Sequence, residues 1–320
     1  MEDRFGRKIE YLRISITDRC NMRCRYCMPD GIEKVSMDRI LTYEDILRIA
    51  EAAVSIGITR FKITGGEPLV RLGCPGLVKN LKAIPGVEQV TLTTNGMELA
   101  RYMDELAAAG LDAVNISLDT MDPDRFRYIT QCGDLAMVMS GIDAAVASGI
   151  RTKVNCVPQK GFNDDEIEKI ADFAFEKGID VRFIELMPVG SADAGSGLSN
   201  EDLLERLRAV YPELEPDESI HGNGPAVYYY IPGKRGSIGL ISAMHGAFCD
   251  RCNRLRLTSQ GVIKPCLCYD ETVDLKPALS GTISDIKDKL AEAISIKPKQ
   301  HCFNDDPERV EKRQMSQIGG

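Results

Sequence analysis

The sequence predicts an α/β fold. Six parallel β/α units form an incomplete TIM-like (β/α)6 barrel, and a C-terminal extension follows it. Strand-like apolar segments alternate with amphipathic helical segments over the first part of the chain. Six such segments are too few for a complete eight-stranded barrel. A doubly wound sheet has the same element order, but the polar residues along one face of most strands favour the partial barrel.

The strand segments alternate in polarity. In the first, apolar Leu12 and Ile14 alternate with polar Arg13 and Ser15. Strands of a parallel sheet that helices cover on both faces normally read as continuous apolar runs. We therefore expect one polar face, which becomes a wet, cation-bearing lumen when the sheet closes; a face open to solvent is the alternative. The strand segments are 9–17, 60–64, 89–95, 113–119, 152–157 and 181–186.

The helical segments between these strands carry recognisable ends. Thr42 is the expected N-cap of the first, and Asp45 three residues later resembles a capping box. Another helix is expected to begin at Asn163. A helix from Asn200 to about Val210 comes next, and the Gly/Pro-rich segment near 222–226 predicts a boundary. The expected units are residues 1–225 and 226–320. The helix-stop glycines are Gly110, Gly149 and Gly178.

Composition narrows the functional classes. The formal net charge of −8 argues against general nucleic-acid binding. No run of residues approaches the length of a membrane span, and the N-terminus lacks an apolar export signal, so we expect a cytoplasmic protein without membrane contact. Eleven cysteines in such a chain favour metal ligation over disulfides.

The segment Thr17–Pro29 contains three cysteines, Cys20, Cys24 and Cys27, which together span eight residues. They cannot all pair as disulfides, and a tetrahedral zinc site needs a fourth ligand. They can hold three irons of a four-iron four-sulfur cluster and leave the fourth iron open, as a catalytic metal requires. A redox cysteine cluster or half of a zinc site is the alternative. The spacing resembles the signature of the radical S-adenosylmethionine (SAM) superfamily, in which the open iron binds SAM.

A second cysteine set, Cys249, Cys252 and Cys266, lies near the C-terminus, with Cys268 two residues further on. A four-cysteine zinc knuckle is a serious alternative here, because CxxC followed by CxC supplies four thiolates. Neighbouring arginines favour an anionic ligand instead, since a structural zinc site needs none. These arginines are Arg251, Arg254 and Arg256.

Further motifs make the resemblance closer. CNMRCRYCMP, ITGGEPLVR, LTTNG, NISLD, KVNCV, FIELMPVG, CDRCNRLRLT followed by PCL, and a terminal Gly-Gly occur in this order. From about residue 6 to 320 the chain resembles the GTP 3′,8-cyclase family of molybdenum cofactor biosynthesis. The resemblance implies an incomplete barrel whose C-terminal extension carries a second iron–sulfur cluster. It implies two 4Fe-4S clusters and SAM as cofactors, with the two cysteine sets as ligands. The remaining cysteines, Cys268 included, have no ligand role.

Other site residues follow from the same resemblance. The paired glycines of ITGGEP let backbone approach a ligand closely, and Pro68 holds Glu67 extended. The SAM-binding positions are Tyr26, Gly66, Ser117 and Met187, where packing under the cysteine loop is the alternative for Tyr26 and core packing for Met187. The GTP-contacting positions are Arg13, Lys62, Thr93, Lys153, Arg254, Leu255 and Arg256, with Lys160 as the alternative to Lys153. The catalytic positions are Gly319, Gly320, Arg13, Arg254 and Arg256.

The implied activity is that of a radical SAM lyase. A 5′-deoxyadenosyl radical removes the hydrogen at the ribose C3′ of GTP, and the carbon radical attacks guanine C8 to give 3′,8-cyclo-7,8-dihydro-GTP. A radical SAM enzyme that modifies a peptide is one alternative, and a non-catalytic iron–sulfur or zinc protein is another. The resemblance also implies an electron donor. The donor's identity, the oligomeric state (a homodimer among the options) and direct transfer of product to the next pathway enzyme stay open.

Overall fold

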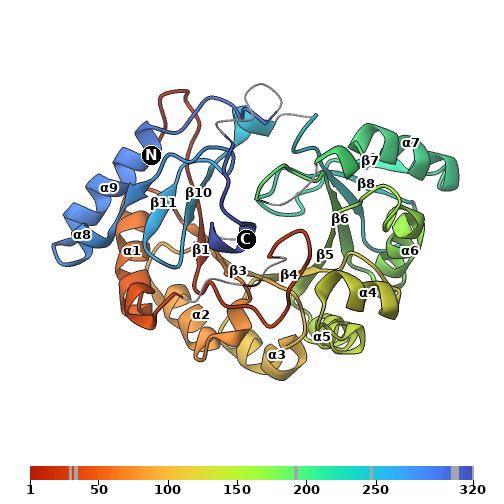
Figure 1. Ribbon diagram of the computed structural model, residues 1–320, viewed down its shortest axis with the longest axis horizontal. Helices are drawn as coiled ribbons and strands as arrows, with labels where there is room; N and C mark the ends of the chain where they lie inside the picture. Colours follow the sequence, from red (N-terminus) through yellow and green to blue (C-terminus); the bar gives the residue numbers. More distant parts are fainter. Residues whose placement is uncertain (29–30, 32–34, 191–193, 246–247, 304–309, 319–320) are drawn as a thin grey trace.

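The six predicted strands are all present and pair in parallel, in chain order, through the centre of one sheet. Figure 1 shows this computed structural model, which describes residues 1–28, 31, 35–190, 194–245, 248–303 and 310–318. The alternation of strands and helices that the sequence predicts is confirmed. These strands are β1 (Tyr11–Ser15), β2 (Arg60–Thr64), β3 (Gln89–Thr94), β4 (Ala113–Ser117), β5 (Arg151–Cys156) and β6 (Asp180–Ile184).

Strands from the C-terminal third of the chain flank both sides of these six. Strand β10 (Arg254–Leu257) pairs in parallel with β1, and β9 (Ile238–Ile241) pairs in parallel with β6. Antiparallel strands extend both edges, and the described strands follow the order β12-β11-β10-β1-β2-β3-β4-β5-β6-β9-β8-β7. One sheet therefore contains strands from both sides of residue 225. The outer strands are β7 (Glu215–Asp217), β8 (Val227–Tyr230), β11 (Val262–Lys264) and β12 (Val273–Asp274).

Helices cover the outer face of the sheet, while the inner faces of the strands surround a central space (Figure 1). The first helix begins as predicted: Thr42 Oγ1 accepts a hydrogen bond from the Asp45 N–H, and Asp45 Oδ2 accepts one from the Thr42 N–H. The helices are α1 (Tyr43–Ser55), α2 (Cys74–Ala83), α3 (Leu99–Ala108), α4 (Pro123–Thr130), α5 (Leu135–Ala147), α6 (Ile167–Lys177), α7 (Asn200–Val210), α8 (Lys276–Leu279) and α9 (Ile283–Ser295).

The predicted start of one helix at Asn163 is wrong. The side chain of Asn163 donates to the carbonyls of Asp119 and Val157, so it bridges the ends of β4 and β5. The next three residues form a short 3-10 turn, and α6 begins only at Ile167. The side-chain oxygen that would cap a helix, Asn163 Oδ1, instead accepts from the Gln159 N–H at 2.7 Å.

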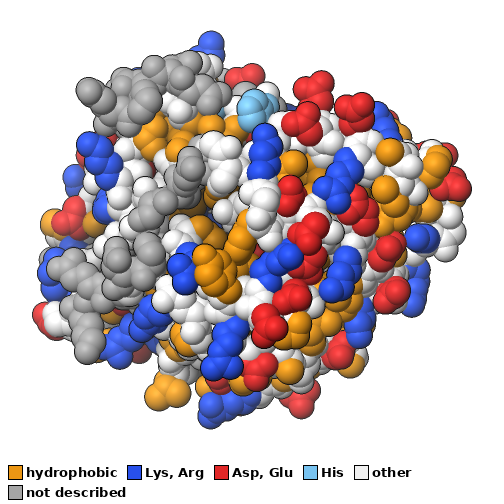
Figure 2. Space-filling view, turned by 45° about the vertical axis from the view of Figure 1, so that its right-hand side comes forward, with side chains coloured by type: hydrophobic (Ala, Val, Ile, Leu, Met, Phe, Trp, Pro, Cys, Tyr) orange, Lys and Arg blue, Asp and Glu red, His pale blue; other side chains and the backbone are white. Residues whose placement is uncertain are grey.

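The core lies between the helices and the outward face of the sheet. Leu12 and Ile14 of β1 and Phe61 and Ile63 of β2 are fully buried there. Positive and negative side chains are interspersed on the face of the molecule shown in Figure 2. Among the described residues, no helix combines the length and the apolar character that crossing a membrane requires.

The described end of the chain returns to the centre of the molecule (Figure 1). The Glu311 N–H donates to the Cys268 carbonyl at 2.7 Å, and the Glu311 carboxylate bonds the buried ammonium of Lys264. Ile318 is fully buried. Gly319 and Gly320, two of the predicted catalytic positions, lie outside the described residues.

Candidate active site

A cavity of about 240 Å³ opens on the inner face of the sheet. Neighbouring strands bring their polar residues to it in register: Arg13 of β1 is aligned with Lys62 of β2 and with Arg256 of β10. Thr93 of β3 is aligned with Asn115 of β4. In-register residues of parallel strands point to the same face, so this alignment produces a continuous polar wall. The predicted polar interior is confirmed.

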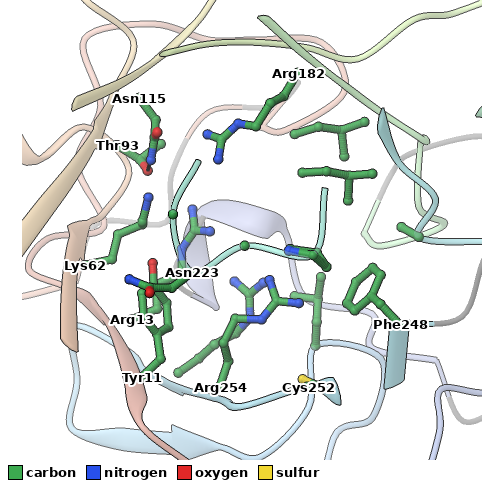
Figure 3. Close-up of a pocket in the computed structure, with 18 of the residues that line it drawn as sticks. Tyr11, Arg13, Lys62, Thr93, Asn115, Arg182, Asn223, Phe248, Cys252 and Arg254 are labelled. Carbon is green, nitrogen blue, oxygen red and sulfur yellow. Dashed lines mark hydrogen bonds between the residues drawn. The ribbon is translucent and has the colours of Figure 1, made fainter. Parts of the chain in front are cut away.

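The charge of this wall is strongly one-sided. No Asp or Glu of the described part of the chain lines the cavity. Figure 3 shows Arg13, Lys62 and Arg254 with their nitrogen atoms in the open space, and Arg182 reaching into it from the opposite side. Such an arrangement suits a ligand that carries several negative charges. The cationic side chains that line it are Arg13, Lys62, Arg151, Lys153, Arg182, Arg254, Arg256 and Lys297.

The crowded cations affect one another. Burial and, after it, the positive charges of Arg182 and Arg13 hold the pKa of Lys62 well below its usual range. Burial likewise lowers the pKa of Arg13 to about 10. The Nε of Arg13 is buried and has no hydrogen-bond partner among the described residues. An anion in the cavity would supply that partner and relieve the repulsion between the cations.

Lys153 differs from the other cations because protein groups already bind it. Its Nζ lies 2.7 Å from Asp180 Oδ2 and donates to the Tyr228 hydroxyl at 2.9 Å. Burial lowers the pKa of Lys153 to about 8, although Asp180 opposes this shift. The alternative candidate, Lys160, is exposed and is not among the described lining residues. The structure thus places Lys153, and not Lys160, in the cavity wall.

The second cysteine set lies in the same wall. Cys249, Cys252 and Cys266 all line the cavity. Burial raises the pKa of Cys252, but the charges of Lys297 and Arg254 more than offset it and lower that pKa to about 6. The Cys268 thiol lies 3.3 Å from the Cys302 thiol in a separate buried contact. Cys268 also lines the cavity with its thiol against that of Cys302, and among the described residues no three His, Cys, Asp or Glu side chains are grouped there as ligands of one ion.

The first cysteine set lies outside this cavity, in the loop that follows β1. Burial raises the pKa of Cys20 to about 11 and that of Cys27 to about 12. Cys20 Sγ accepts hydrogen bonds from the Met22 N–H at 3.4 Å and from the Asn95 amide at 3.8 Å. A backbone hydrogen bond from Ser316, near the described end of the chain, stabilises the Cys27 thiolate.

Gly66 brings two backbone segments together. A Cβ at Gly66 would lie 2.5 Å from the Arg19 carbonyl oxygen, and one at Gly65 would lie 2.7 Å from that of Thr17. Short hydrogen bonds join the same segments, from the Gly66 N–H to the Thr17 carbonyl and from the Glu67 N–H to the Arg19 carbonyl. The sequence predicts a close approach to a ligand here, and the structure shows a close approach of this backbone to the cysteine loop.

The other predicted positions are spread around these two sites. The Tyr26 hydroxyl donates to Asp119 Oδ2 at 2.7 Å, which ties the cysteine loop to the end of β4. Ser117 is half-buried at the last position of β4, and Met187 lines the cavity. The Leu255 side chain is fully buried in the core, because it alternates with Arg254 and Arg256 along β10. Only its backbone is available to a ligand in the cavity.

Sequence reasoning missed some residues of the cavity wall. Arg182 alternates with buried Val181 and Phe183 on β6, so the polarity pattern that identified Arg13 would have found it. His221 and Asn223 line the cavity from a Gly/Pro-rich segment without periodicity. His221 stacks on Tyr228 with ring centroids 3.9 Å apart and lies 2.9 Å from Asp180. No local sequence signal indicates that contact.

The two cysteine sets suit clusters better than single ions. In the described part of the chain, no three His, Cys, Asp or Glu side chains lie close enough together to hold one metal ion. An iron–sulfur cluster is larger than an ion and binds cysteines that are further apart. Within each set the thiolates are near enough to raise one another's pKa, as Cys27 and Cys20 do for Cys24 after burial. The donor sets therefore fit iron–sulfur clusters.

Known families match the chain in two consecutive parts. Residues 14–174 match the Radical SAM superfamily, and residues 179–303 match the Molybdenum Cofactor Synthesis C family. Two solved structures share the fold at 17% identity. One is Streptococcus suis SuiB bound to S-adenosylmethionine, with a TM-score of 0.64 over 87% of this chain and 65% of that chain. The other is anSMEcpe with bound AdoMet, with a TM-score of 0.60 over 92% of this chain and 82% of that chain.

Curated relatives match over the full length. The GTP 3′,8-cyclase of Moorella thermoacetica is 47% identical over 100% of both chains. That of Alkaliphilus oremlandii is 44% identical, again over 100% of both chains. These matches cover the whole chain, so the chain belongs to the GTP 3′,8-cyclase family within the radical SAM superfamily.

Proposed function

We propose that this chain converts GTP to 3′,8-cyclo-7,8-dihydro-GTP in molybdenum cofactor biosynthesis, as a radical SAM lyase. The observation that carries the proposal is the cavity itself. Cationic side chains surround it, no described Asp or Glu lines it, and a three-cysteine set lies in its wall. A nucleoside triphosphate offers both a polyanion for the cations and a base for that wall.

The cations bind and orient the triphosphate. Arg13, Arg254 and Arg256 can each engage phosphate oxygens with a two-pronged guanidinium, while Lys62 acts as a point charge. We add Arg182 to this group, since Asn155 Oδ1 accepts from its Nε at 2.9 Å and orients it. Thr93 supplies a hydroxyl beside them, and Leu255 a backbone contact. Lys153, held by Asp180 and Tyr228, is the most fixed of the cations.

The first cysteine set is proposed to hold a 4Fe-4S cluster through Cys20, Cys24 and Cys27. When bound, that cluster and SAM supply the 5′-deoxyadenosyl radical that removes the C3′ hydrogen. The chain's own part is to place SAM beside the cavity, through Tyr26, Gly66, Ser117 and Met187. Tyr26 is already oriented by its hydrogen bond to Asp119, and Met187 lies in the cavity wall. Enclosure by the sheet keeps water from the reacting carbon.

The second cysteine set is proposed to hold a second 4Fe-4S cluster through Cys249, Cys252 and Cys266, facing the guanine. Their common position in the wall supports this role, as does the engagement of Cys268 with Cys302. We describe the fold as an incomplete (β/α)6 barrel, residues 1–225, with residues 226–320 as the substrate-binding extension. The Gly319–Gly320 end is proposed to enter the active site, and the buried Ser316 and Ile318 support this path.

The reaction also requires an electron donor. We propose that the enzyme acts in the cytoplasm. Neither nucleic acid nor membrane is a proposed partner.

An anaerobic assay tests the reaction. The reduced protein, reconstituted with iron and sulfide, is incubated with SAM and GTP, and the products are identified by mass spectrometry. We expect 5′-deoxyadenosine and a cyclised nucleotide in equal amounts. Formation of 5′-deoxyadenosine with a peptide but not with GTP would instead favour a peptide-modifying enzyme. Clusters that show no spectroscopic response to SAM would favour an electron carrier.

A further inference from the structure

A short segment after α9 contacts the backbone on both sides of the second cysteine set. This segment, residues 297–301, is called the clasp below. The Lys297 side chain donates to two carbonyls, and the carbonyls of Pro298 and Lys299 accept from Arg7. The backbone of His301 hydrogen-bonds the Cys249 thiolate. None of these residues is among the cysteine ligands or the cations of the sheet strands.

Arg7 connects the clasp to the first of the three cysteines. Its guanidinium donates to the Cys249 carbonyl at 2.8 Å, to the Lys299 carbonyl at 2.9 Å and to the Pro298 carbonyl at 2.7 Å. Asp3 accepts from its Nε at 2.7 Å and neutralises it. Asp3 and Arg7 are each 7% exposed. A buried ion pair near the N-terminus therefore fixes two distant backbone segments to each other.

Lys297 fixes the other two cysteines. Its Nζ donates to the Arg254 carbonyl at 2.8 Å, two residues beyond Cys252, and to the Pro265 carbonyl at 2.6 Å, directly before Cys266. The residue is 2% exposed. None of the acidic side chains that the structure describes forms an ion pair with it. A buried ammonium without a carboxylate is costly, so a nearby negative charge is the expected compensation.

The thiolates are the negative groups at hand. Lys297 lines the same cavity as Cys252 and Cys266, and its ammonium is bonded to backbone carbonyls close to both in the chain, so its charge favours negative charge on their sulfur atoms. Arg7 and Lys297 thus differ in the net charge that they bring to the second cysteine set. Arg7 is neutralised by Asp3 and acts through geometry alone, while Lys297 adds both geometry and a net positive charge.

We propose that Arg7 and Lys297 are positioning residues of the second cysteine set, and that Lys297 also raises the reduction potential of the cluster held there. Hydrogen bonds and net charge around the ligands set both the affinity for a cluster and its potential. This inference rests on the proposed second cluster. It goes beyond it by assigning the residues that hold the set together from outside the cysteine motif.

The test isolates the second set. In a parent variant that carries Cys20→Ala, Cys24→Ala and Cys27→Ala, only the second set binds a cluster. Lys297→Met is compared in this parent with Lys299→Met, an exposed lysine of the same segment. Iron and sulfide that remain after a chelator challenge are measured, and the midpoint potential is followed by electron paramagnetic resonance. We expect Lys297→Met to bind iron about 10- to 100-fold more weakly. The remaining cluster should have a lower potential.

The outcomes separate this inference from the proposed function. A parent variant that binds no iron, or binds zinc, would overturn the second cluster and the clasp together. If the parent binds a cluster but Lys297→Met and Lys299→Met have the same iron affinity and the same potential, only the proposed role of Lys297 is contradicted. Lys297→Arg keeps the charge, and we expect it to restore most of the potential.

A reciprocal parent checks for general damage. It carries Cys249→Ala, Cys252→Ala and Cys266→Ala, so that only the first set binds a cluster. Lys297→Met should leave its iron content unchanged, and an equal loss there would contradict a specific role. Arg7→Gln should weaken iron binding in the first parent without a comparable change of potential, while Arg4→Gln, an exposed neighbour, should change neither.

Discussion

The two cysteine sets differ in their surroundings as well as in their spacing. In the first set, burial raises the pKa of every thiol, to about 11 for Cys20 and about 12 for Cys27. In the second, burial also raises the pKa of Cys249, but at Cys252 the charges of Lys297 and Arg254, with hydrogen bonds from Arg254, outweigh burial and lower the pKa to about 6. The second set also lines the cation-rich cavity, whereas the first lies outside it.

This contrast suggests different roles for the two cysteine sets. The first set lies in a loop whose backbone is closely packed against Gly65 and Gly66. Positive charge gathers around the second set, where an anionic substrate is expected. We therefore propose that radical generation belongs to the first set, outside the cavity, and substrate binding to the second set, in the cavity wall. Variants at each end should separate the two processes.

The largest separation is expected from the cysteines. Cys24→Ala should abolish 5′-deoxyadenosine formation, because the cluster that cleaves SAM loses a ligand. Cys252→Ala should retain SAM cleavage and lose the cyclised nucleotide. Both products are quantified by liquid chromatography and mass spectrometry after anaerobic reconstitution. Loss of 5′-deoxyadenosine in both variants to the same extent would remove the distinction between the two sets.

A second separation is expected in binding. Arg254→Ala should weaken GTP binding by about 10- to 100-fold, because a charge-assisted contact to phosphate is lost. SAM binding should be unchanged, since Arg254 belongs to the second site. Isothermal titration calorimetry measures both. Arg101→Ala, whose side chain is 71% exposed on α3, is the control and should affect neither.

A smaller effect is expected from pH. Burial lowers the pKa of Lys153 to about 8, so its positive charge is lost as the pH rises through 8. GTP affinity should fall by up to about 10-fold between pH 7 and pH 9. Lys153→Arg should reduce this fall, since arginine stays charged while Lys62, whose pKa is also lowered, still titrates. A pH profile that is the same in the variant would show that Lys153 does not contact the anion.

The same shift affects stability, with a definite sign. Between pH 8 and the ordinary lysine value of 10.5, the unfolded chain binds more protons at Lys153 than the folded chain does. The free energy of unfolding should therefore rise with pH in that window. Lys153→Met should remove this contribution, which denaturant titrations at several pH values would measure.

The smallest effect is expected at the described end of the chain, residues 310–318. Arg313 binds Glu311, but its side chain is 40% exposed, and such pairs contribute under about 1 kcal/mol. Arg313→Ala should lower the free energy of unfolding by no more than this. Urea denaturation gives the value. A much larger loss would mean that Arg313, and not buried Lys264, fixes Glu311.

Local patterns predicted the framework well. Alternation of apolar and polar residues identified the six strands and the inward direction of Arg13, Lys62 and Lys153. Cysteine spacing identified the two sets, because their ligands come from short segments. Thr42 and Asp45 identified the start of the first helix, because a capping box also depends only on residues close together in the chain.

Contacts between distant segments were beyond these patterns. Arg7 reads as an ordinary charged residue near the N-terminus, and its contact with Cys249 spans 242 residues. Lys297 likewise gives no sign in the sequence that it is buried. The approach of Gly66 to Arg19 depends on how two loops pack, whereas the glycine pair alone indicated an approach to a ligand.

The placement of β9 and β10 on opposite flanks of the six central strands has a consequence for biosynthesis. While the ribosome is still making the chain, both outer strands of the central six have unsatisfied backbone groups until residues 238–257 have emerged. The six central strands cannot complete their sheet by themselves, and the nascent chain depends on late, long-range strand pairing. A newly made molecule is thus most prone to aggregation just before its last quarter is translated.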